Sequence, residues 1–153
     1  MNAWRPQQEI QVKALGLVWR DACLLASKIY RDDGSVKGVR PLGGRLEFGE
    51  TWQEALVREF EEELQVQIEV VGTPLFLENI YAHHGMVGHE IVVLSDVLFP
   101  DTTYHEKDVI EYSEDNGERC RAGWFNPENL DRGGLELYPK GLKTALAERR
   151  RNS

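Results

Sequence analysis

Residues 44–66 read GRLEFGETWQEALVREFEEELQV, and most of what the sequence predicts follows from this segment. Thr51 and Glu54 have the spacing of a capping box, in which the threonine hydroxyl caps a helix start and the glutamate reaches back to the cap. Apolar residues then recur at helical spacing from Leu56 to Leu64. The segment therefore predicts a helix that begins at Thr51, ends near Leu64 and buries one face.

The predicted helix gathers acidic side chains at unfavourable positions. Glu59 lies three and four positions before Glu62 and Glu63, where like charges repel by roughly a few tenths of a kcal/mol per pair. Glu61 points away from them and is expected to be solvated. Acidic residues in the last turn also face the negative end of the helix dipole, at roughly 0.3–1 kcal/mol each. A divalent cation would turn this repulsion into ligation, and oxygen ligands favour Mg²⁺ or Mn²⁺ over zinc.

A solvated acidic face is the alternative interpretation, and a run of glutamates alone would favour it. The residues around the helix start favour a metal site instead. Gly43 and Gly44 let the backbone come close to a ligand or metal, and Glu50 adds a carboxylate just before the cap. Arg58 supplies a guanidinium that can hold one of the carboxylates in place.

Gly44, Glu50 and the run from Arg58 to Glu63 have the spacing of a known family motif. Together with Val66 they resemble the Nudix box, G-x5-E-x7-R-E-U-x-E-E-x-G-U, in which U is an apolar residue. Gln65 stands where the family has the glycine that ends the helix. We therefore expect either a strained backbone at this residue or a different helix end.

The resemblance continues outside the box and covers most of the chain. Residues 41–44, PLGG, resemble the P-G-G sequence that leads into the box, and residues 124–130 are similar to the family's W-x-x-x-x-E-L ending. Residues 89–91, HEI, resemble a strand start in relatives that act on nucleoside diphosphate sugars. The resemblance implies an α+β fold, a Nudix-type α/β/α sandwich with a central mixed β-sheet, formed by residues 1–153 as one domain.

The resemblance also implies which residues form the site. The metal ligands would be Glu50, Glu59, Glu62, Glu63 and the backbone carbonyl of Gly43 or Gly44. Arg58 would orient a glutamate through a salt bridge. The candidate substrate contacts are Gly43, Gly44, His89 and Glu90. The alternatives are a structural role for His89 and, for Glu90, either an approach to the metals from a facing strand or an exposed charge at a strand end.

The implied reaction is the Mg²⁺-dependent hydrolysis of a diphosphate bond, with Mn²⁺ as an alternative ion. Metal ions bridge phosphate oxygens, stabilise the charge of the transition state and lower the pKa of a bound water. Glu62 is the first candidate for the general base, and Glu59, Glu63 and Arg58 complete the expected catalytic set. Glu118 is the second candidate and also a possible further ligand, with Glu111 and Glu114 as alternatives on the same loop. Simple solvation is the competing interpretation for these three loop residues.

The substrate is expected to be a small molecule, a nucleoside diphosphate linked to another moiety, from which a nucleoside monophosphate is released. The HEI sequence at residues 89–91 favours ADP-ribose or another nucleoside diphosphate sugar. A nucleoside triphosphate and a dinucleoside polyphosphate are alternatives. A non-catalytic nucleotide-binding module is another, although such a module has no reason to keep a destabilising acidic cluster.

The composition is that of an ordinary globular domain. The chain has 153 residues, of which 41% are hydrophobic and 29% charged. Its net charge of −8 makes it a poor general binder of nucleic acid. It has no apolar run of the ~20 residues that a membrane span needs, and its first residues lack a signal-peptide core. We therefore expect a cytoplasmic protein without nucleic-acid or membrane partners. The family resemblance suggests a homodimer, and Trp4 is a candidate stacking or dimer contact.

Apolar patterns outside the box predict the remaining elements. The expected strands cover residues 11–19, 22–30 and 66–71, followed by a hairpin of residues 75–81 and 90–99. Loops or breaks are expected at residues 31–38 and 41–44, and residues 101–117 have little strand character. Residues 124–125 begin a last apolar segment, and residues 138–150 predict a final helix.

Overall fold

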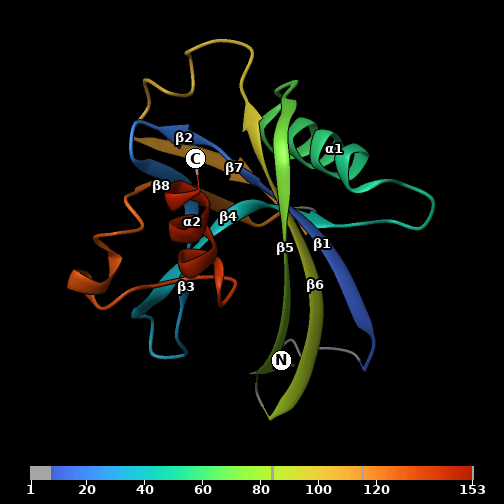
Figure 1. The fold of residues 1–153 in the computed structure, drawn as a ribbon, viewed down its shortest axis with the longest axis vertical. Coiled ribbons are helices and arrows are strands. Elements are labelled where there is room, and N and C mark those ends of the chain that lie inside the picture. Colours follow the sequence, from blue (N-terminus) through green and yellow to red (C-terminus); the bar gives the residue numbers. More distant parts are fainter. Residues whose placement is uncertain (1–7, 84, 115, 153) are drawn as a thin grey trace.

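The strands form one mixed sheet in the computed structural model, which describes residues 8–83, 85–114 and 116–152 (Figure 1). They are β1 (Ile10–Leu17), β2 (Trp19–Arg20), β3 (Cys23–Tyr30), β4 (Val36–Arg45), β5 (Glu69–His83), β6 (Met86–Leu98), β7 (Val109–Ser113), β8 (Arg119–Phe125) and β9 (Glu136–Leu137). The helices are α1 (Trp52–Leu64), the 3-10 helix η1 (Leu130–Gly133) and α2 (Leu142–Arg151). Within these ranges, none of the helices has the length and apolar character required to cross a membrane.

Strand β4 lies at the centre of the sheet and changes partner along its length. The strand order is β5-β6-β1-β4-β3-β8-β7, with β2 beside β3 and β9 beside β4. The first part of β4 pairs with β3 as far as Pro41, and the last part pairs with β1 from Leu42 onward. A residue without an N–H is tolerated where the strand passes from one partner to the next. The break predicted at residues 41–44 is therefore wrong, because one strand runs through it.

The two faces of the sheet carry separate apolar cores, and each core belongs to one helix. Phe60 of α1 packs in a cluster that includes Ile110 of β7. Leu142 and Leu146 of α2 pack in the other cluster, which includes Val92 of β6. The helices stand apart in the ribbon view (Figure 1). The sheet therefore separates two helical layers, and the predicted α/β/α sandwich is confirmed.

The strands extend further than the sequence predicted. Strand β4 begins inside the loop expected at residues 31–38, and β7 lies in residues 101–117, where little strand was expected. Ile110 and Tyr112 are buried while the other residues of β7 are exposed, which is the alternation of a half-buried strand. The polar residues around them hide this short pattern. The predicted hairpin of residues 75–81 and 90–99 is confirmed by the antiparallel pair β5 and β6.

Three other boundaries were predicted wrongly. The strand expected from Val66 begins at Glu69, because the residues between them are held in the α1 core or exposed before the strand starts. Residues 124–125 end β8 instead of opening a new segment. The final helix begins at Leu142 and not at Tyr138, so its N-terminal turn lies further along the chain.

Helix α1 ends at a left-handed residue, which is the first of the two alternatives expected from the missing box glycine. Gln65 has φ 53° and ψ 42°, and its backbone N–H bonds back to the carbonyl oxygen of Glu61. Its side-chain Nε2 donates to the carbonyl oxygen of Glu62 at 2.9 Å. The glutamine thus accepts a conformation that favours glycine, and its amide recovers part of the cost.

We expect Gln65→Gly to stabilise the fold, because glycine adopts the left-handed conformation without steric cost. The gain should be about 0.5–1 kcal/mol after loss of the amide bond, which for a domain of this size raises Tm by roughly 1–4 °C. Gln67→Gly is the matched control, because Gln67 is also exposed but has a negative φ. It should lower Tm instead. Thermal unfolding of both variants measures the difference, and equal shifts would show that the backbone at Gln65 is not strained.

Candidate active site around helix α1

The loop between β4 and α1 fixes a carboxylate at the start of the helix. The capping box is formed, with the Glu54 N–H donating to Thr51 Oγ1 at 3.1 Å and the Thr51 N–H donating to Glu54 Oε1 at 3.0 Å. Glu50 stands immediately before this cap and accepts the Glu47 N–H at 2.8 Å. The carboxylate of Glu50 is thereby held by the loop itself and by the helix that follows.

Arg58 lies at the centre of the acidic residues. Its Nη2 and Nε donate to the two oxygens of Glu50 at 2.6 and 3.0 Å. Its Nη1 donates to Glu59 Oε1 at 2.8 Å and lies 3.4 Å from Glu62 Oε2. Nη2 also reaches the carbonyl oxygen of Arg45 on β4 at 3.2 Å. One guanidinium therefore joins the loop, the helix and the strand, and it contacts three of the predicted metal ligands.

The charges in this cluster shift one another's proton affinities. The bidentate bond to Glu50, and then the bond to Glu59, raise the pKa of Arg58 although partial burial opposes them. In turn, the hydrogen bonds from Arg58 hold the pKa of Glu50 below its ordinary value, against the effect of burial. Both directions favour the charged forms, so the pair stays ionised at neutral pH.

Gly44 gives Glu59 the space that it occupies. A Cβ atom at Gly44 would lie 2.4 Å from the carboxyl carbon of Glu59, so any side chain there would displace the carboxylate. At Gly43 a Cβ atom would lie 2.1 Å from the carbonyl oxygen of Ala14 on β1. Glu59 itself is only 4% exposed. Gly44 thus allows a buried carboxylate to rest directly on the backbone of β4, while Gly43 allows β4 to pack closely against β1.

The remaining glutamates of α1 point in different directions. The side chain of Glu62 is 47% exposed beside Arg58, and Glu61 is exposed as expected. Glu63 is half-buried. Burial raises the pKa of Tyr112 on β7, and nearby negative charges, including that of Glu63, raise it further. Glu59, Glu62 and Glu63 therefore surround one end of the helix without meeting at one point.

The carboxylates around α1 are ligands that suit a hard cation, but they are not arranged as a complete metal-binding site. Among the residues that the structure describes, no three carboxylate, imidazole or thiol groups stand in a metal-binding arrangement. All the candidate donors are oxygens, which Mg²⁺ and Mn²⁺ prefer. The space at Gly44 brings Glu59 against the β4 backbone.

Glu114 and Glu118 flank the β7–β8 turn, whereas Glu111 lies within strand β7 and not on the loop where it was expected. Glu118 is exposed, and its N–H and carbonyl bond to Asn116 and Glu114 within the turn. Glu111 pairs with two exposed arginines of β8. Burial raises the pKa of Tyr112, and the charges of Glu114 and Glu63 raise it further. The role of Glu118 as base or ligand stays a prediction.

His89 and Glu90 lie away from the α1 carboxylates. Glu90 is 5% exposed. It shares one face of β6 with Val92 and Leu94, which belong to the α2 core. It therefore lies on the face opposite α1, so neither an approach to the metals nor an exposed strand-end charge describes it. His89 Nε2 lies 3.3 Å from Glu78 Oε2 at the partly exposed hairpin. Their contact with a substrate stays a prediction, and Trp4 lies outside the described residues.

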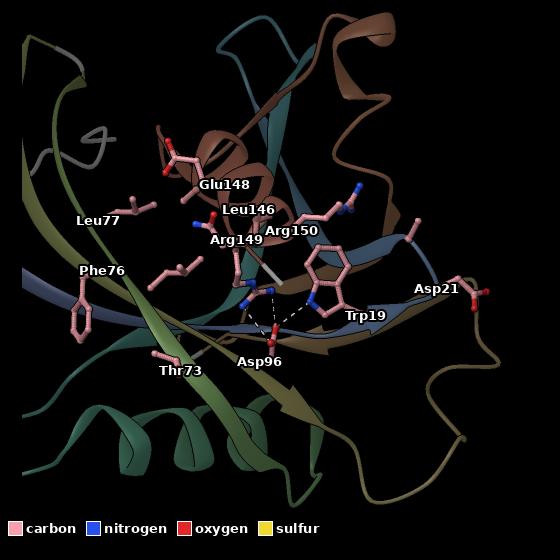
Figure 2. Close-up of a pocket in the computed structure, with 14 residues that line it drawn as sticks. Trp19, Asp21, Thr73, Phe76, Leu77, Asp96, Leu146, Glu148, Arg149 and Arg150 are labelled. Carbon is pink, nitrogen blue, oxygen red and sulfur yellow. Dashed lines mark hydrogen bonds and ion pairs between the residues drawn. The ribbon is translucent and has the colours of Figure 1, made fainter.

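A larger cavity lies elsewhere, between the end of α2 and strands β2, β5 and β6 (Figure 2). Its volume is about 930 Å³. Trp19 Nε1 donates to Asp96 Oδ1 at 3.0 Å, and Arg149 Nη1 lies 3.2 Å from Asp96 Oδ2. Figure 2 shows these three side chains pointing toward one another. None of the predicted site residues lines this cavity.

Comparisons with known proteins agree with the motif. The family model described as NUDIX domain matches residues 10–146. No curated protein sequence compared with the chain matches it. Similar solved structures include the E. coli ORF135 protein, at 20% identity and TM-score 0.56 over 93% of this chain and 91% of that one. A MutT NUDIX hydrolase from Burkholderia pseudomallei has 22% identity and TM-score 0.56 over 79% and 86%. An ADP-ribose pyrophosphatase from Streptococcus suis has 16% identity and TM-score 0.51 over 94% and 92%. At these identities the likeness shows the fold alone.

We expect Arg58→Gln to destabilise the protein, because it leaves Glu50 and the buried Glu59 without their counter-charge. Breaking a buried ion pair costs 3–5 kcal/mol, and we expect about 2–3 kcal/mol here because the Arg58 side chain is 21% exposed. Arg45→Gln is the control, since its side chain is 61% exposed and 3.9 Å from its partner. It should change the free energy of unfolding by less than about 0.5 kcal/mol. Urea unfolding compares the two, and equal losses would contradict the central role of Arg58.

Proposed function

This chain belongs to the Nudix family of hydrolases, and from that premise we propose that it cleaves the diphosphate bond of a nucleoside diphosphate linked to another moiety. The observation that carries the proposal is the buried Glu59, which rests on Gly44 and is bonded to Arg58. A buried carboxylate is costly unless it is paired or binds a metal, and Arg58 supplies one such partner. The family membership and this arrangement together favour hydrolysis of a phosphorus anhydride over simple nucleotide binding.

We assign the metal site to Glu50, Glu59, Glu62, Glu63 and the carbonyl oxygen of Gly43. Bound there, Mg²⁺ or Mn²⁺ would neutralise the diphosphate and make water a better nucleophile. Arg58 would keep Glu50 and Glu59 ionised and in place, as its bonds to both carboxylates favour. The glycine pair would let the diphosphate approach the β4 backbone.

Glu62 is the proposed general base. Its side chain is 47% exposed and lies 3.4 Å from Arg58, so it can turn between the guanidinium and a water molecule. In the proposed step Glu62 takes the proton as the water attacks phosphorus and a nucleoside monophosphate leaves. Glu118 and Glu114 at the β7–β8 turn are the second candidates for this role.

ADP-ribose or another nucleoside diphosphate sugar is the proposed substrate. This choice follows from residues 89–91, HEI, which resemble relatives that act on such sugars. A nucleoside triphosphate or a dinucleoside polyphosphate is the alternative. A cytoplasmic location and a homodimer stay predictions.

We expect Glu62→Gln and Glu63→Gln to abolish most turnover while the fold survives. Loss of one ligand or base should cost about 3 kcal/mol or more of transition-state stabilisation, which is roughly a hundredfold or more in kcat. The measurement is the release of nucleoside monophosphate from a panel of ADP-ribose, nucleoside diphosphate sugars, triphosphates and dinucleoside polyphosphates with Mg²⁺ or Mn²⁺. Circular dichroism confirms that the variants are folded.

Glu61→Gln is the matched control, because Glu61 lies on the same helix but is exposed away from the cluster. It should change kcat by less than about twofold. If no compound in the panel is hydrolysed while one of them still binds, the chain is a binding module and the proposed reaction is wrong. A loss of stability in Glu63→Gln as large as that of a core deletion would give Glu63 a structural role instead.

A further inference from the structure

A second polar pocket is lined by residues of β1, β4, β5 and β6 and of the segment that leads into α2. Its volume is about 600 Å³, which is within the usual range for small-molecule sites. Its lining includes Lys13, Arg40, Asn79, Tyr81, Glu90 and Tyr138. None of the α1 carboxylates lines it. The pocket therefore combines buried charges with two aromatic rings, outside the proposed metal site.

Glu90 is the single buried carboxylate that lines this pocket, and it already has hydrogen-bond and ion-pair partners. Lys13 Nζ lies 2.8 Å from Glu90 Oε2, and the two side chains are 16% and 6% exposed. Asn79 Nδ2 donates to Glu90 Oε1 at 3.3 Å. Burial by itself would raise the pKa of Glu90, but Lys13, Arg40 and Asn79 together lower it. Glu90 is therefore ionised, and its charge is balanced by Lys13.

Arg40 is a second cation that this carboxylate does not balance. Its Nη2 atom is buried and has no hydrogen-bond partner among the residues that the structure describes. Burial lowers the pKa of Lys13, and the charge of Arg40 lowers it further. A buried guanidinium N–H without an acceptor is costly, and native proteins rarely leave one. The structure thus shows an excess of positive charge and a guanidinium whose hydrogen-bonding capacity is not filled by the described residues.

The charge of the whole pocket has the same sign. Its lining holds four cationic side chains, Lys13, Lys37, Arg40 and Lys140, but only two carboxylates, Glu90 and Glu136. The chain as a whole carries a net charge of −8, so this local excess opposes its overall charge. In the larger cavity of Figure 2, Asp96 pairs with Arg149 and accepts a hydrogen bond from Trp19. The arginine there has a carboxylate partner, unlike Arg40 Nη2 in the second pocket.

Strand β4 connects this pocket to the proposed reaction site. Arg40 precedes Gly44 by four residues, which is about 13 Å along an extended strand. Lys13 on β1 lies opposite Arg45 in the sheet, beside the pair formed by Ala14 and Gly44. The pocket and the backbone at Gly44 are therefore held at a fixed spacing by one strand.

We propose that this pocket binds a second anionic group of the substrate, a phosphate or a carboxylate on the part of the molecule away from the cleaved diphosphate. The inference rests on the proposed function and narrows its substrate class. The guanidinium of Arg40 donates to an oxygen of that group, and Lys13 adds its charge while it remains bonded to Glu90. Tyr81 and Tyr138 offer rings on which the attached ring system can lie.

The first test measures binding without catalysis. Isothermal titration in EDTA compares adenosine 3′,5′-bisphosphate with adenosine 5′-monophosphate, so that only the additional phosphate differs. The wild-type chain should bind the bisphosphate about tenfold more tightly or better. Arg40→Gln should reduce this preference to about twofold or less. Arg119→Gln is the control, because it removes an equally charged side chain that is 80% exposed on β8, and it should keep the preference.

The second test identifies the source of the anionic group. With Mg²⁺ present, kcat/KM is compared between ADP-ribose and its 2′-phosphate, and between UDP-glucose and UDP-glucuronate. A preference for the phosphorylated compound assigns a phosphate, and a preference for glucuronate assigns a carboxylate. Either preference should disappear in Arg40→Gln. Arg40→Lys, which keeps the charge, should retain part of it and guards against a variant that fails to fold.

The outcomes separate this inference from the proposed reaction. A binding preference that depends on Arg40, together with no hydrolysis of any compound, would support the pocket and refute the reaction. Equal binding of mono- and bisphosphate together with equal hydrolysis within both pairs would overturn the pocket while leaving the reaction intact. A preference that survives in Arg40→Gln would also overturn the assignment, because another residue would then be responsible.

Discussion

The bonds from Arg58 to Glu50 and Glu59 hold together the part of the molecule on which everything else depends. They join a loop, a helix and, through the carbonyl oxygen of Arg45, the central strand. Without this guanidinium the carboxylates of α1 would repel one another and the negative end of the helix dipole. With it they stay ionised, and Glu59 is pressed against Gly44. The same bonds that offset the electrostatic cost of the acidic cluster also place its members near the backbone that a diphosphate would approach.

Strand β4 relates the chemistry to the fold because it has two partners and meets two sites. Its end at Gly43 and Gly44 pairs with β1 and lies under Glu59. Its earlier part pairs with β3 and carries Arg40 to the pocket that also contains Lys13 and Glu90. Since one continuous strand holds both ends, their spacing is set by backbone geometry and not by loops. A substrate that reaches both would therefore meet a rigid frame.

The sequence predicted best the features that neighbouring residues determine. The start and end of α1 follow from a capping box and an apolar period within one segment, and both were placed correctly. The break predicted at residues 41–44 was wrong. Pro41 and the two glycines lie where β4 passes from β3 to β1, and the strand continues through them because it changes partner there. The sequence analysis did not identify Lys13 or Arg40 as candidate site residues. Lys13 interrupts the otherwise largely apolar strand β1, and that was the one local signal; its partners come from strands distant in the chain.

The buried ion pair of Lys13 and Glu90 is hard to explain as a contribution to stability. Replacing such a pair by apolar residues of similar size is often neutral or stabilising, because desolvation of both charges offsets their attraction. Arg40 adds a further, partly buried charge whose Nη2 atom is buried and unsatisfied within the described residues, which makes the group less favourable still. A chain with a net charge of −8 would in addition repel a polyanionic substrate over most of its surface. Positive charge concentrated at one pocket, and kept in place there by Glu90, is what such a chain needs to hold an anionic ligand beside its own carboxylates.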